Sequence, residues 1–174
     1  MELNYNIGAG DKPIKRWKNL DIGDDIELNG IRDVNKIYAS HFLEYFDKVQ
    51  VRILLQSWYD ALKKDGVLQI SVPDFAKIAQ VYREEGVILD GPLYGKIGTG
   101  NKDEIRRVFD SIMENKVAVT PGKDTDLIYH KSVFDKVTLR EALLLAGFRH
   151  VKEFKSFHDD CSKDPISLNL QCQK

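Results

Sequence analysis

The fold is decided by the stretch LNYNIGAGD, residues 3–11, which the stretch NLDI, residues 19–22, follows almost at once. The first five residues of the opening stretch predict a short strand. Gly8 and Gly10 then carry no Cβ, so the backbone can turn sharply there and approach a ligand closely. Asp21 stands at the tip of the next expected strand, where an acidic side chain binds two ribose hydroxyls. This order of residues predicts an adenosine-binding site.

The connection between these two strands is unusually short. About ten residues separate the glycines from Asp21, whereas a crossover connection usually needs about a dozen or more. Residues 11–18 therefore have room for about one helical turn. Asn4 and Asn6 also interrupt a strand that would be apolar throughout if both faces were buried. We expect one sheet face near this strand to lack its usual cover, which a second copy of the chain, in a homodimer, could supply.

Composition predicts a single ordinary domain. The 174 residues carry a formal net charge of −1 and are 43% hydrophobic, so one core can form and no broad basic surface for nucleic acid is expected. The opening residues lack a signal-peptide pattern, and no apolar run is long enough to cross a membrane. Cys161 and Cys172 lack the spacing of a metal site or a disulfide framework. We expect a cytoplasmic protein that binds neither nucleic acid nor membranes.

The rest of the chain alternates between strand and helix patterns, which indicates an α/β protein with a mostly parallel sheet. Strands are expected over residues 37–40, 67–72, 148–154 and 166–173. Helices are expected from the cap Asp47 to Gly66, from Pro73-Asp74 onward with the apolar stripe Phe75, Ile78, Ala79 and Tyr82, and from Thr138 to Gly147, where Thr138 and Glu141 form a capping box. Because no helix separates the last two strands, they are expected to form an antiparallel hairpin at the sheet edge.

A long insertion at about residues 86–130 interrupts this alternation within the single domain, residues 1–174. Glycines and a proline crowd its first part. Insertions of this length in compact α/β domains often serve as lids or binding loops. We expect a lid-like segment here, with a loop of no function as the alternative.

Two histidines are the candidates for catalysis. His41 follows the strand ending at Ser40, again at the ligand edge of the sheet, and can act as a general base, while Glu44 can contact a ligand. The structural alternative is a hydrogen-bonded histidine at a helix start and a favourable charge in the first turn. His130, at the end of the insertion, is the second candidate base. The group His158-Asp159-Asp160 lacks specific metal-ligand spacing, so no metal is predicted.

With these residues placed, the chain resembles the class I S-adenosylmethionine-dependent methyltransferases, and within them the small type 11 methyltransferase-like proteins. The resemblance rests on residues 3–13, 19–22, 38–46, 62–74, 129–135, 146–148 and 158–160. It implies a Rossmann-like sheet of seven strands in the order 3-2-1-4-5-7-6, with the last strand antiparallel and the first crossover helix abbreviated. The cofactor that it implies is S-adenosylmethionine.

The resemblance also implies positions for the cofactor. Glycines 8 and 10 would approach its methionine part, Asp21 would hold the ribose, and Asp24 or Asp25 would lie near the adenine. Ser40 and His41 would face the sulfonium. The full set of implied cofactor-binding residues is Asn6, Gly8, Ala9, Gly10, Asp21, Ile22, Asp25 and Ser40.

The function that follows is methyl transfer from S-adenosylmethionine to an oxygen or nitrogen of a small-molecule or glycan-like acceptor, with His41 or His130 as base. The chain has Asn6 where the family usually has an acid, and its first crossover is short. These departures support an alternative, a catalytically silent protein that binds S-adenosylmethionine or another nucleotide, or a scaffold with the same fold. An NAD-dependent oxidoreductase is a third and less favoured reading, because no second half for a dinucleotide follows.

Overall fold

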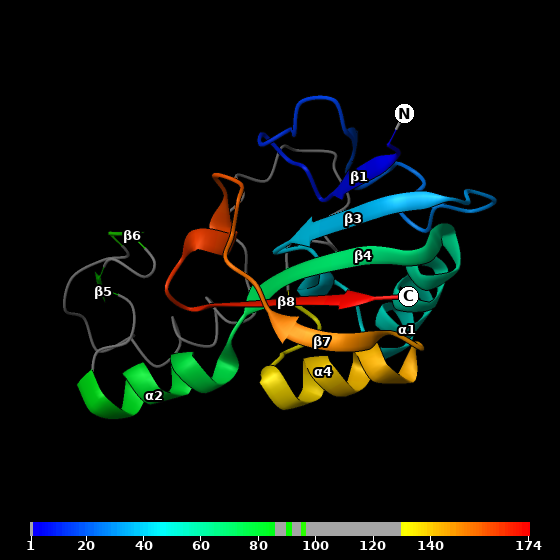
Figure 1. The fold of residues 1–174 in the computed structure, drawn as a ribbon. Helices are drawn as coiled ribbons and strands as arrows, with labels where there is room; N and C mark the ends of the chain where they lie inside the picture. Colours follow the sequence, from blue (N-terminus) through cyan, green and yellow to red (C-terminus); the bar gives the residue numbers. More distant parts are fainter. Residues whose placement is uncertain (1, 86–89, 92–94, 97–129) are drawn as a thin grey trace.

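A computed structural model describes residues 2–85, 90–91, 95–96 and 130–174 of the chain. Its centre is a six-stranded sheet in the order β2-β1-β3-β4-β8-β7, seen in Figure 1. The strands are β1 (Asn4–Ile7), β2 (Lys18–Leu20), β3 (Val34–Ser40), β4 (Leu62–Pro73), β7 (Arg149–Glu153) and β8 (Ser167–Gln173). Only β8 runs against its neighbours β4 and β7 within this sheet. The expected α/β class and the antiparallel last strand are therefore confirmed.

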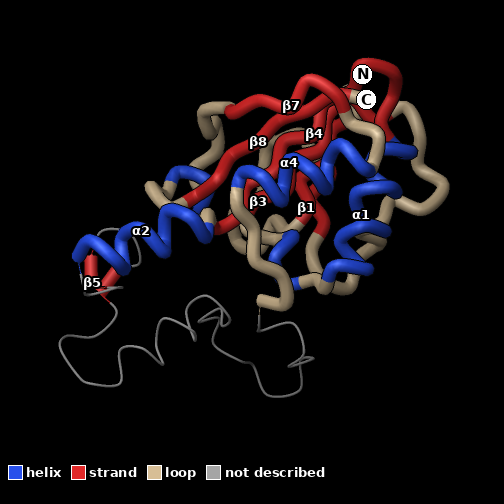
Figure 2. The backbone as a smooth tube through the Cα atoms, turned by 90° about the horizontal axis from the view of Figure 1, so that it is seen from below, coloured by secondary structure: helices blue, strands red, loops and turns tan. Residues whose placement is uncertain are grey.

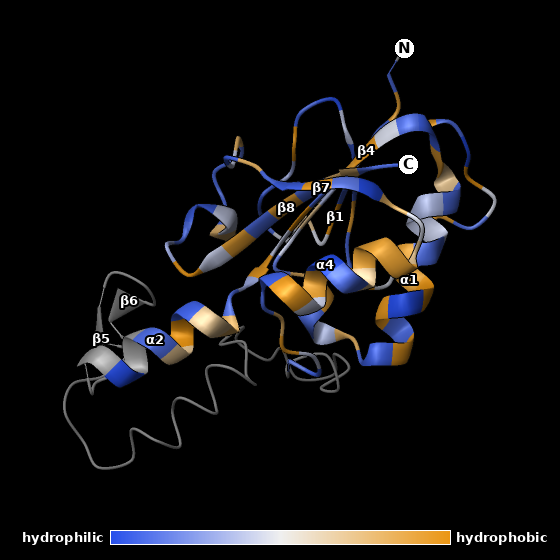
Figure 3. Cartoon of the chain, turned by 60° about the horizontal axis from the view of Figure 1, so that its bottom comes forward, coloured by the Kyte–Doolittle hydropathy of each residue, from blue (hydrophilic) through white to orange (hydrophobic). Residues whose placement is uncertain are grey.

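Two helices, α1 (Lys48–Ala61) and α4 (Lys136–Leu145), pack on the same face of the sheet, as Figure 2 shows. Apolar and polar residues alternate along both helices (Figure 3), and their apolar sides meet the apolar side of the strands. The shared core includes Ile7, Ile37, Ala39, Leu54, Leu55, Trp58, Leu68, Ile70, Leu139, Leu143 and Leu170. A third helix, α2 (Phe75–Glu85), extends from the carboxyl end of β4.

The expected seven-strand order is wrong in one respect, because the outermost strand beside β2 is missing from the described part of the chain. Residues 22–33, where that strand would lie, contain turns and a single isolated bridge between Ile22 and Asp24. This segment packs against α1 instead, where the indole nitrogen of Trp58 donates to the carbonyl of Ile26 over 2.7 Å. Twelve residues that include Gly23 and Gly30 are too few for a helix and a returning strand.

The first crossover contains no helix at all. Residues 8–17 form turns, so even the single helical turn expected there is absent. The face of β1 near this crossover is nevertheless covered, contrary to expectation, because Tyr5, Asn6 and Ile7 are all buried. The cover comes partly from residues 8–17 of the crossover and partly from residues 154–166.

Helix α1 begins as expected and ends earlier than expected. Asp47 caps it, with its carboxylate accepting from the backbone of Val49 and Gln50 at 2.8 and 2.9 Å. The helix ends at Ala61, however, and β4 begins at once, so Gly66 is not a helix cap. A Cβ on Gly66 would lie 3.0 Å from the carbonyl oxygen of Val34. Gly66 therefore permits the close approach of β3 and β4. The segment pairs as a strand, although its composition is typical of the end of a helix.

Two other helix details differ from the sequence expectation. The capping box of α4 joins Asp135 and Thr138, rather than Thr138 and Glu141, because the helix starts at Lys136. The stripe expected on α2 is also wrong for Phe75 and Ala79, which are exposed.

Most of the expected lid, residues 86–130, lies outside the described residues. Its described parts are β5 (Asp90–Gly91) and β6 (Gly95–Lys96), which pair as a small separate ladder, and His130. None of the described helices combines the length and the apolar character that crossing a membrane requires.

Candidate functional site

Four parallel strands end at one edge of the sheet. The strands β1, β2, β3 and β4 end at Ile7, Leu20, Ser40 and Pro73. Each is followed directly by a residue that the sequence singled out: Gly8, Asp21, His41 or Asp74. In open α/β sheets, ligands bind at this edge. Asp74 acts as a cap of α2, since its carboxylate accepts from the backbone of Ala76 over 3.1 Å.

The glycine turn after β1 is tied to the tip of β2. The amides of Gly8 and Ala9 both donate to the carbonyl of Leu20, over 2.9 and 3.0 Å. The amide of Gly10 donates to Asp21 Oδ2 over 3.1 Å. The other carboxylate oxygen of Asp21 accepts from the amide of Ile22 over 2.8 Å. These bonds fix the Asp21 side chain beside the glycine turn.

Gly8 and Gly10 are each glycine for a different structural reason. Both adopt positive φ, +73° at Gly8 and +50° at Gly10, which favours glycine. A Cβ on Gly8 would meet three atoms of the Phe42 side chain within 2.8 Å, so this glycine is required by an internal contact. A Cβ on Gly10 would have no atom within 4 Å, so the backbone there borders open space. Gly10 is therefore the glycine that can approach a ligand.

The hydrogen-bond acceptor at this edge fits an adenosine group. A carboxylate has about four lone-pair directions, and the hydrogen bonds from Gly10 and Ile22 use two of those on Asp21. The remaining directions can accept from ribose hydroxyls. Ser40 lies half buried at the end of β3, and the Ile22 side chain is largely exposed.

The other implied cofactor residues make contacts within the protein. Asn6 is buried, and its side-chain amide donates to Asn19 Oδ1 over 2.9 Å and to the carbonyl of Lys12 over 3.2 Å. It therefore holds the short crossover against the sheet. Asp24 accepts from the Asp21 amide over 2.8 Å, and Asp25 accepts from the Asn29 amide over 3.0 Å. Both carboxylates stabilise the turn after β2.

Both candidate histidines lie around one buried carboxyl group. Glu44, in the short 3-10 helix η1 (Leu43–Tyr45), has an exposed fraction of only 1%. Nδ1 of His41 lies 3.5 Å from Glu44 Oε1, and Nε2 of His130 lies 4.0 Å from the same oxygen. The backbone amides of Lys131 and Ser132 donate to the Glu44 carbonyl over 2.7 and 3.1 Å. The structure thus brings the two predicted bases together across 89 residues of sequence.

A serine fixes the tautomer of His41. Nε2 of His41 lies 2.7 Å from the hydroxyl oxygen of Ser167, which lies 2.7 Å from the carbonyl oxygen of Cys161. Two oxygens at that distance need a hydrogen between them, so the Ser167 hydroxyl donates to the carbonyl. Its oxygen must then accept from His41, whose proton is on Nε2. The unprotonated Nδ1 faces Glu44.

Burial keeps both Glu44 and His41 neutral. Removal from water raises the pKa of the Glu44 carboxyl to about 8 and lowers the pKa of His41 to about 4, since burial disfavours the charged form of either group. The nearby His130 lowers the pKa of His41 further. At neutral pH, Glu44 is therefore a neutral, protonated carboxyl, and His41 is a neutral imidazole whose one N–H is on Nε2. A carboxyl that titrates near pH 8 can exchange a proton under physiological conditions.

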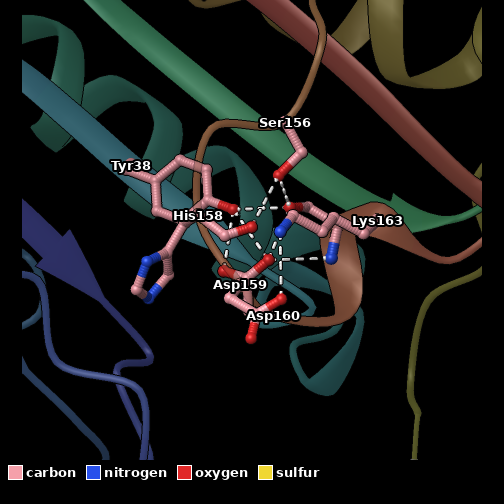
Figure 4. Close-up of polar contacts among 7 residues, drawn as sticks. Tyr38, Ser156, His158, Asp159, Asp160 and Lys163 are labelled. Atoms are coloured by element: carbon pink, nitrogen blue, oxygen red, sulfur yellow. Dashed lines mark hydrogen bonds and ion pairs between the residues drawn. The ribbon is translucent and has the colours of Figure 1, made fainter.

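A second polar cluster lies on the face of the sheet opposite α1 and α4 (Figure 4). The Tyr38 hydroxyl donates to the Asp160 carboxylate over 2.8 Å and lies 2.8 Å from the Ser162 hydroxyl. Burial, and to a smaller extent the Asp160 carboxylate, raises the pKa of Tyr38 to about 12. The Phe157 ring packs on Tyr38 with 5.0 Å between centroids, and His158 contacts the Lys12 carbonyl over 2.9 Å. Residues 154–166 are thereby fastened over the sheet.

The sequence analysis singled out Asp160 within the group at residues 158–160, but it did not link this aspartate to Tyr38. Tyr38 and Asp160 are separated by 122 residues, and no local spacing links them. Within the described residues, no group of three or more histidine, cysteine or acidic side chains is arranged to hold a metal ion.

The sheet defines a class of fold, that of solved S-adenosylmethionine-dependent methyltransferases. A crystal structure of such a methyltransferase from Archaeoglobus fulgidus matches with a TM-score of 0.57 and 14% identity, over 99% of this chain and 86% of that one. A possible histamine N-methyltransferase from Thermotoga maritima matches with a TM-score of 0.55 and 14% identity, over 100% of this chain and 83% of that one.

A third structure extends the likeness to a protein solved with the cofactor. Human N-acetylserotonin methyltransferase in complex with S-adenosylmethionine matches with a TM-score of 0.52 and 11% identity. The match covers 99% of this chain and 40% of the human one. Comparison with protein-family models gives no match, and neither does comparison with curated protein sequences. At these identities the likeness establishes the fold.

Proposed function

We propose that this protein is a methyltransferase that binds S-adenosylmethionine at the carboxyl edge of β1, β2 and β3. The acceptor would be an oxygen or nitrogen of a small-molecule or glycan-like compound. One observation carries the proposal: the Gly10 amide and the Asp21 carboxylate are joined at the strand ends, with open space beside Gly10. The fold that surrounds this pair is shared with proteins described as S-adenosylmethionine-dependent methyltransferases.

The residues divide the work of binding. Asp21 would accept hydrogen bonds from the ribose hydroxyls, while the backbone at Gly10 would lie along the ligand. Ser40 and His41 would border the reacting end. Bound S-adenosylmethionine supplies an electrophilic methyl group, so the protein mainly has to hold the acceptor in line with it and exclude water.

A hydroxyl acceptor needs a base, and His41 remains our first candidate, with His130 second. Since Nε2 of His41 donates to Ser167, Nδ1 is the nitrogen that can take a proton. That nitrogen faces Glu44 at 3.5 Å, so any proton on it would be shared with the buried carboxyl. Replacing His41 by Ala should remove most turnover with the true acceptor. Intact turnover would reject His41 as the base.

Isothermal titration calorimetry tests cofactor binding directly. The wild-type protein is titrated with S-adenosylmethionine and with its product, S-adenosylhomocysteine, and both should bind. Asp21→Ala should weaken both by about tenfold or more, since hydrogen bonds to a charged group contribute about 1.5–3 kcal/mol. Asp33→Asn is the matched control, because Asp33 is exposed at positive φ, which asparagine tolerates.

Absence of heat and of any thermal shift with both ligands would reject the proposal in favour of the silent scaffold. Binding without turnover on any acceptor would leave the silent cofactor-binding protein. The observation that favours this second candidate is the placement of Asn6, whose side chain holds the crossover and supplies no negative charge.

A further inference from the structure

Two aromatic rings flank a lysine on the face of the sheet opposite α1 and α4. Trp17, directly before β2, lies 6.0 Å from Phe157, measured between ring centroids. The ammonium nitrogen of Lys36, in β3, lies 4.5 Å from the centroid of Phe157 and 5.7 Å from that of Trp17. Phe157 has an exposed fraction of 48%, and the other two residues are half-buried. We call Trp17, Lys36 and Phe157 the ring–lysine cluster.

Lys36 has ring contacts but no anionic partner. Within the described residues, its ammonium group forms neither an ion pair nor a hydrogen bond. An ammonium group has three N–H donors, and contacts with ring faces leave these donors for other partners. The ring–lysine cluster therefore presents a positive charge and hydrogen-bond donors to an anion, directly beside two aromatic rings.

Cations are concentrated around the ring–lysine cluster, although the whole chain has a net charge of −1. Crossover residues 11–18 contain four exposed cations and one exposed acid, namely Lys12, Lys15, Arg16, Lys18 and Asp11. His158 joins the segment of Phe157 to this crossover, through its contact with the Lys12 carbonyl over 2.9 Å. The neighbouring Asp159 is paired with Lys163 over 2.9 Å. The overall composition, which predicts no surface for nucleic acid, averages over this local excess of positive charge.

An open row of side chains continues from Lys36 across the sheet. Its members are neighbours in register on the adjacent strands β1, β3, β4 and β8, namely Asn4, Lys36, Val67 and Gln173. Each of the four is half-buried, and the row spans about 14 Å at a strand spacing of about 4.8 Å. Its two amide side chains can donate and accept hydrogen bonds. Such amides are poorly suited to lipid, where polar groups need partners, but they suit a ligand with polar edges.

We propose that this surface binds single-stranded nucleic acid. Lys36 and the crossover cations would pair with phosphates, the exposed Phe157 ring would stack with a base, and the amides of the row would meet base edges. Proteins that bind single strands combine a positively charged track with aromatic rings that accept any base. An acidic peptide would match the charge but leave the rings unused, and a duplex keeps its bases stacked inside.

The proposed surface is separate from the proposed cofactor site. Lys36 and Asn4 lie toward the amino ends of β3 and β1, whereas Gly10 and Asp21 lie at the carboxyl edge of the sheet. The inference therefore goes beyond the proposed function and does not depend on it. Asp21→Ala should weaken cofactor binding and leave nucleic-acid binding unchanged, so failure of one proposal is distinguishable from failure of the other.

Fluorescence anisotropy with two matched strands tests the proposal. One is a labelled oligodeoxyadenylate of about twelve nucleotides, and the other is an abasic strand of equal length, with the same phosphates and no bases. At about 50 mM salt the adenylate strand should bind with a Kd of about 100 μM or tighter. It should bind at least about fivefold more tightly than the abasic strand, because stacking on an aromatic ring contributes that factor or more.

The dependence on salt tests the phosphate contacts. Raising the salt fourfold should weaken binding by about sevenfold to fiftyfold, which corresponds to two to four phosphate contacts on a single strand. No binding at about 100 μM protein, or equal affinity for the two strands, would overturn the proposal. Binding to phosphatidylserine vesicles without binding to the adenylate strand would assign the surface to membranes and would also overturn it.

Variants test whether the ring–lysine cluster is the site. Lys36→Met keeps the apolar stem beside the rings and removes the charge, so it should weaken both strands and reduce the salt slope by about 0.7. Phe157→Leu should bring the affinity for the adenylate strand close to that for the abasic strand. Lys48→Met, at an exposed lysine at the start of α1, is the matched control and should change neither quantity. Wild-type binding in both cluster variants, at unchanged thermal midpoints, would reject this surface.

Tryptophan fluorescence locates the bound strand independently. The chain has two tryptophans, Trp17 and Trp58, and Trp58 is fully buried in the core. Bases that bind at the cluster should therefore quench Trp17 alone. Trp17→Phe should retain most of the affinity, because an aromatic ring remains, and should abolish the quenching. Binding of the adenylate strand without any quenching in the wild type would place the strand elsewhere and contradict the proposal.

Discussion

The buried carboxyl of Glu44 predicts an unusual dependence of stability on pH. Below pH 4.5, the ordinary pKa of a glutamate, the side chain is protonated in the folded and in the unfolded chain. As the pH rises from 4.5 to about 8, the unfolded chain loses this proton and the folded protein keeps it. The unfolded state is stabilised over that window, so the free energy of unfolding falls. Above about pH 8, both states are ionised and the loss is complete.

The magnitude follows from the two pKa values, which differ by about 3.5. Each unit corresponds to about 1.4 kcal/mol, so the loss over the window is on the order of 4 to 5 kcal/mol. Glu44→Gln removes the titration and keeps the shape of the neutral carboxyl. We therefore expect this variant to match the wild type near pH 5 and to exceed its free energy of unfolding by several kcal/mol near pH 9.

Urea denaturation at a series of pH values measures this difference. Fluorescence of Trp58, buried in the core, reports unfolding. The depressed pKa of His41 makes stability fall as the pH drops from 6.5 to about 4, but both proteins share this effect and it cancels in the difference. Glu153→Gln, at an exposed glutamate, is the control, and its free energy of unfolding should not exceed that of the wild type at high pH. A difference between wild type and Glu44→Gln that stays flat with pH would show that Glu44 is already ionised when folded, and would refute the reasoning.

Three further substitutions, two of them paired with a control variant, test other parts of the structure by thermal or urea denaturation. Tyr38→Phe should cost about 2 kcal/mol, because the half-buried Asp160 carboxylate loses one of its donors and the Ser162 hydroxyl loses a partner, and should lower the midpoint by about 4 to 8 °C; Tyr5→Phe, whose hydroxyl has no hydrogen bond among the described residues, should change stability by less than about 0.5 kcal/mol. Gly8→Ala should cost about 2 kcal/mol or more, from positive φ and the clash with a neighbouring ring, whereas Gly10→Ala should cost about 1 kcal/mol from φ alone; equal costs would contradict the assigned contact. Asp135→Ala should cost about 1 kcal/mol through loss of the α4 cap, and an unchanged midpoint would contradict the capping box.

The sequence predicted most of the sheet because local patterns suffice for it. The alternation in residues 166–173 identifies a strand with one buried face, and the glycines after Ile7 mark the end of the first strand. The cap at Asp47 is also local, since its partners are two and three residues away. These features depend on period and on neighbours in the chain, which a sequence displays directly.

The errors arise where distant segments decide the outcome. Helix α1 ends at Ala61 because the following residues pair with β3, although Gly66 looks like a helix cap. The sequence did place a glutamate near the ligand edge, but Glu44 is buried by residues 130–132, which donate to its backbone from far along the chain. The carboxyl at the centre of the candidate site therefore could not be recognised as buried from its local sequence.

The place of β8 has a consequence for how the protein is made. This strand lies between β4 and β7, although the ribosome synthesises it after both. Gln69 of β4 donates a hydrogen bond to Gln171 of β8, which lies 102 residues later in the chain. In the described sheet, β7 pairs with β8 alone. Pairings of such separation form slowly and leave strand edges open in the meantime. Until β8 is made, β4 is therefore paired only with β3, and β7 lacks its partner in this sheet.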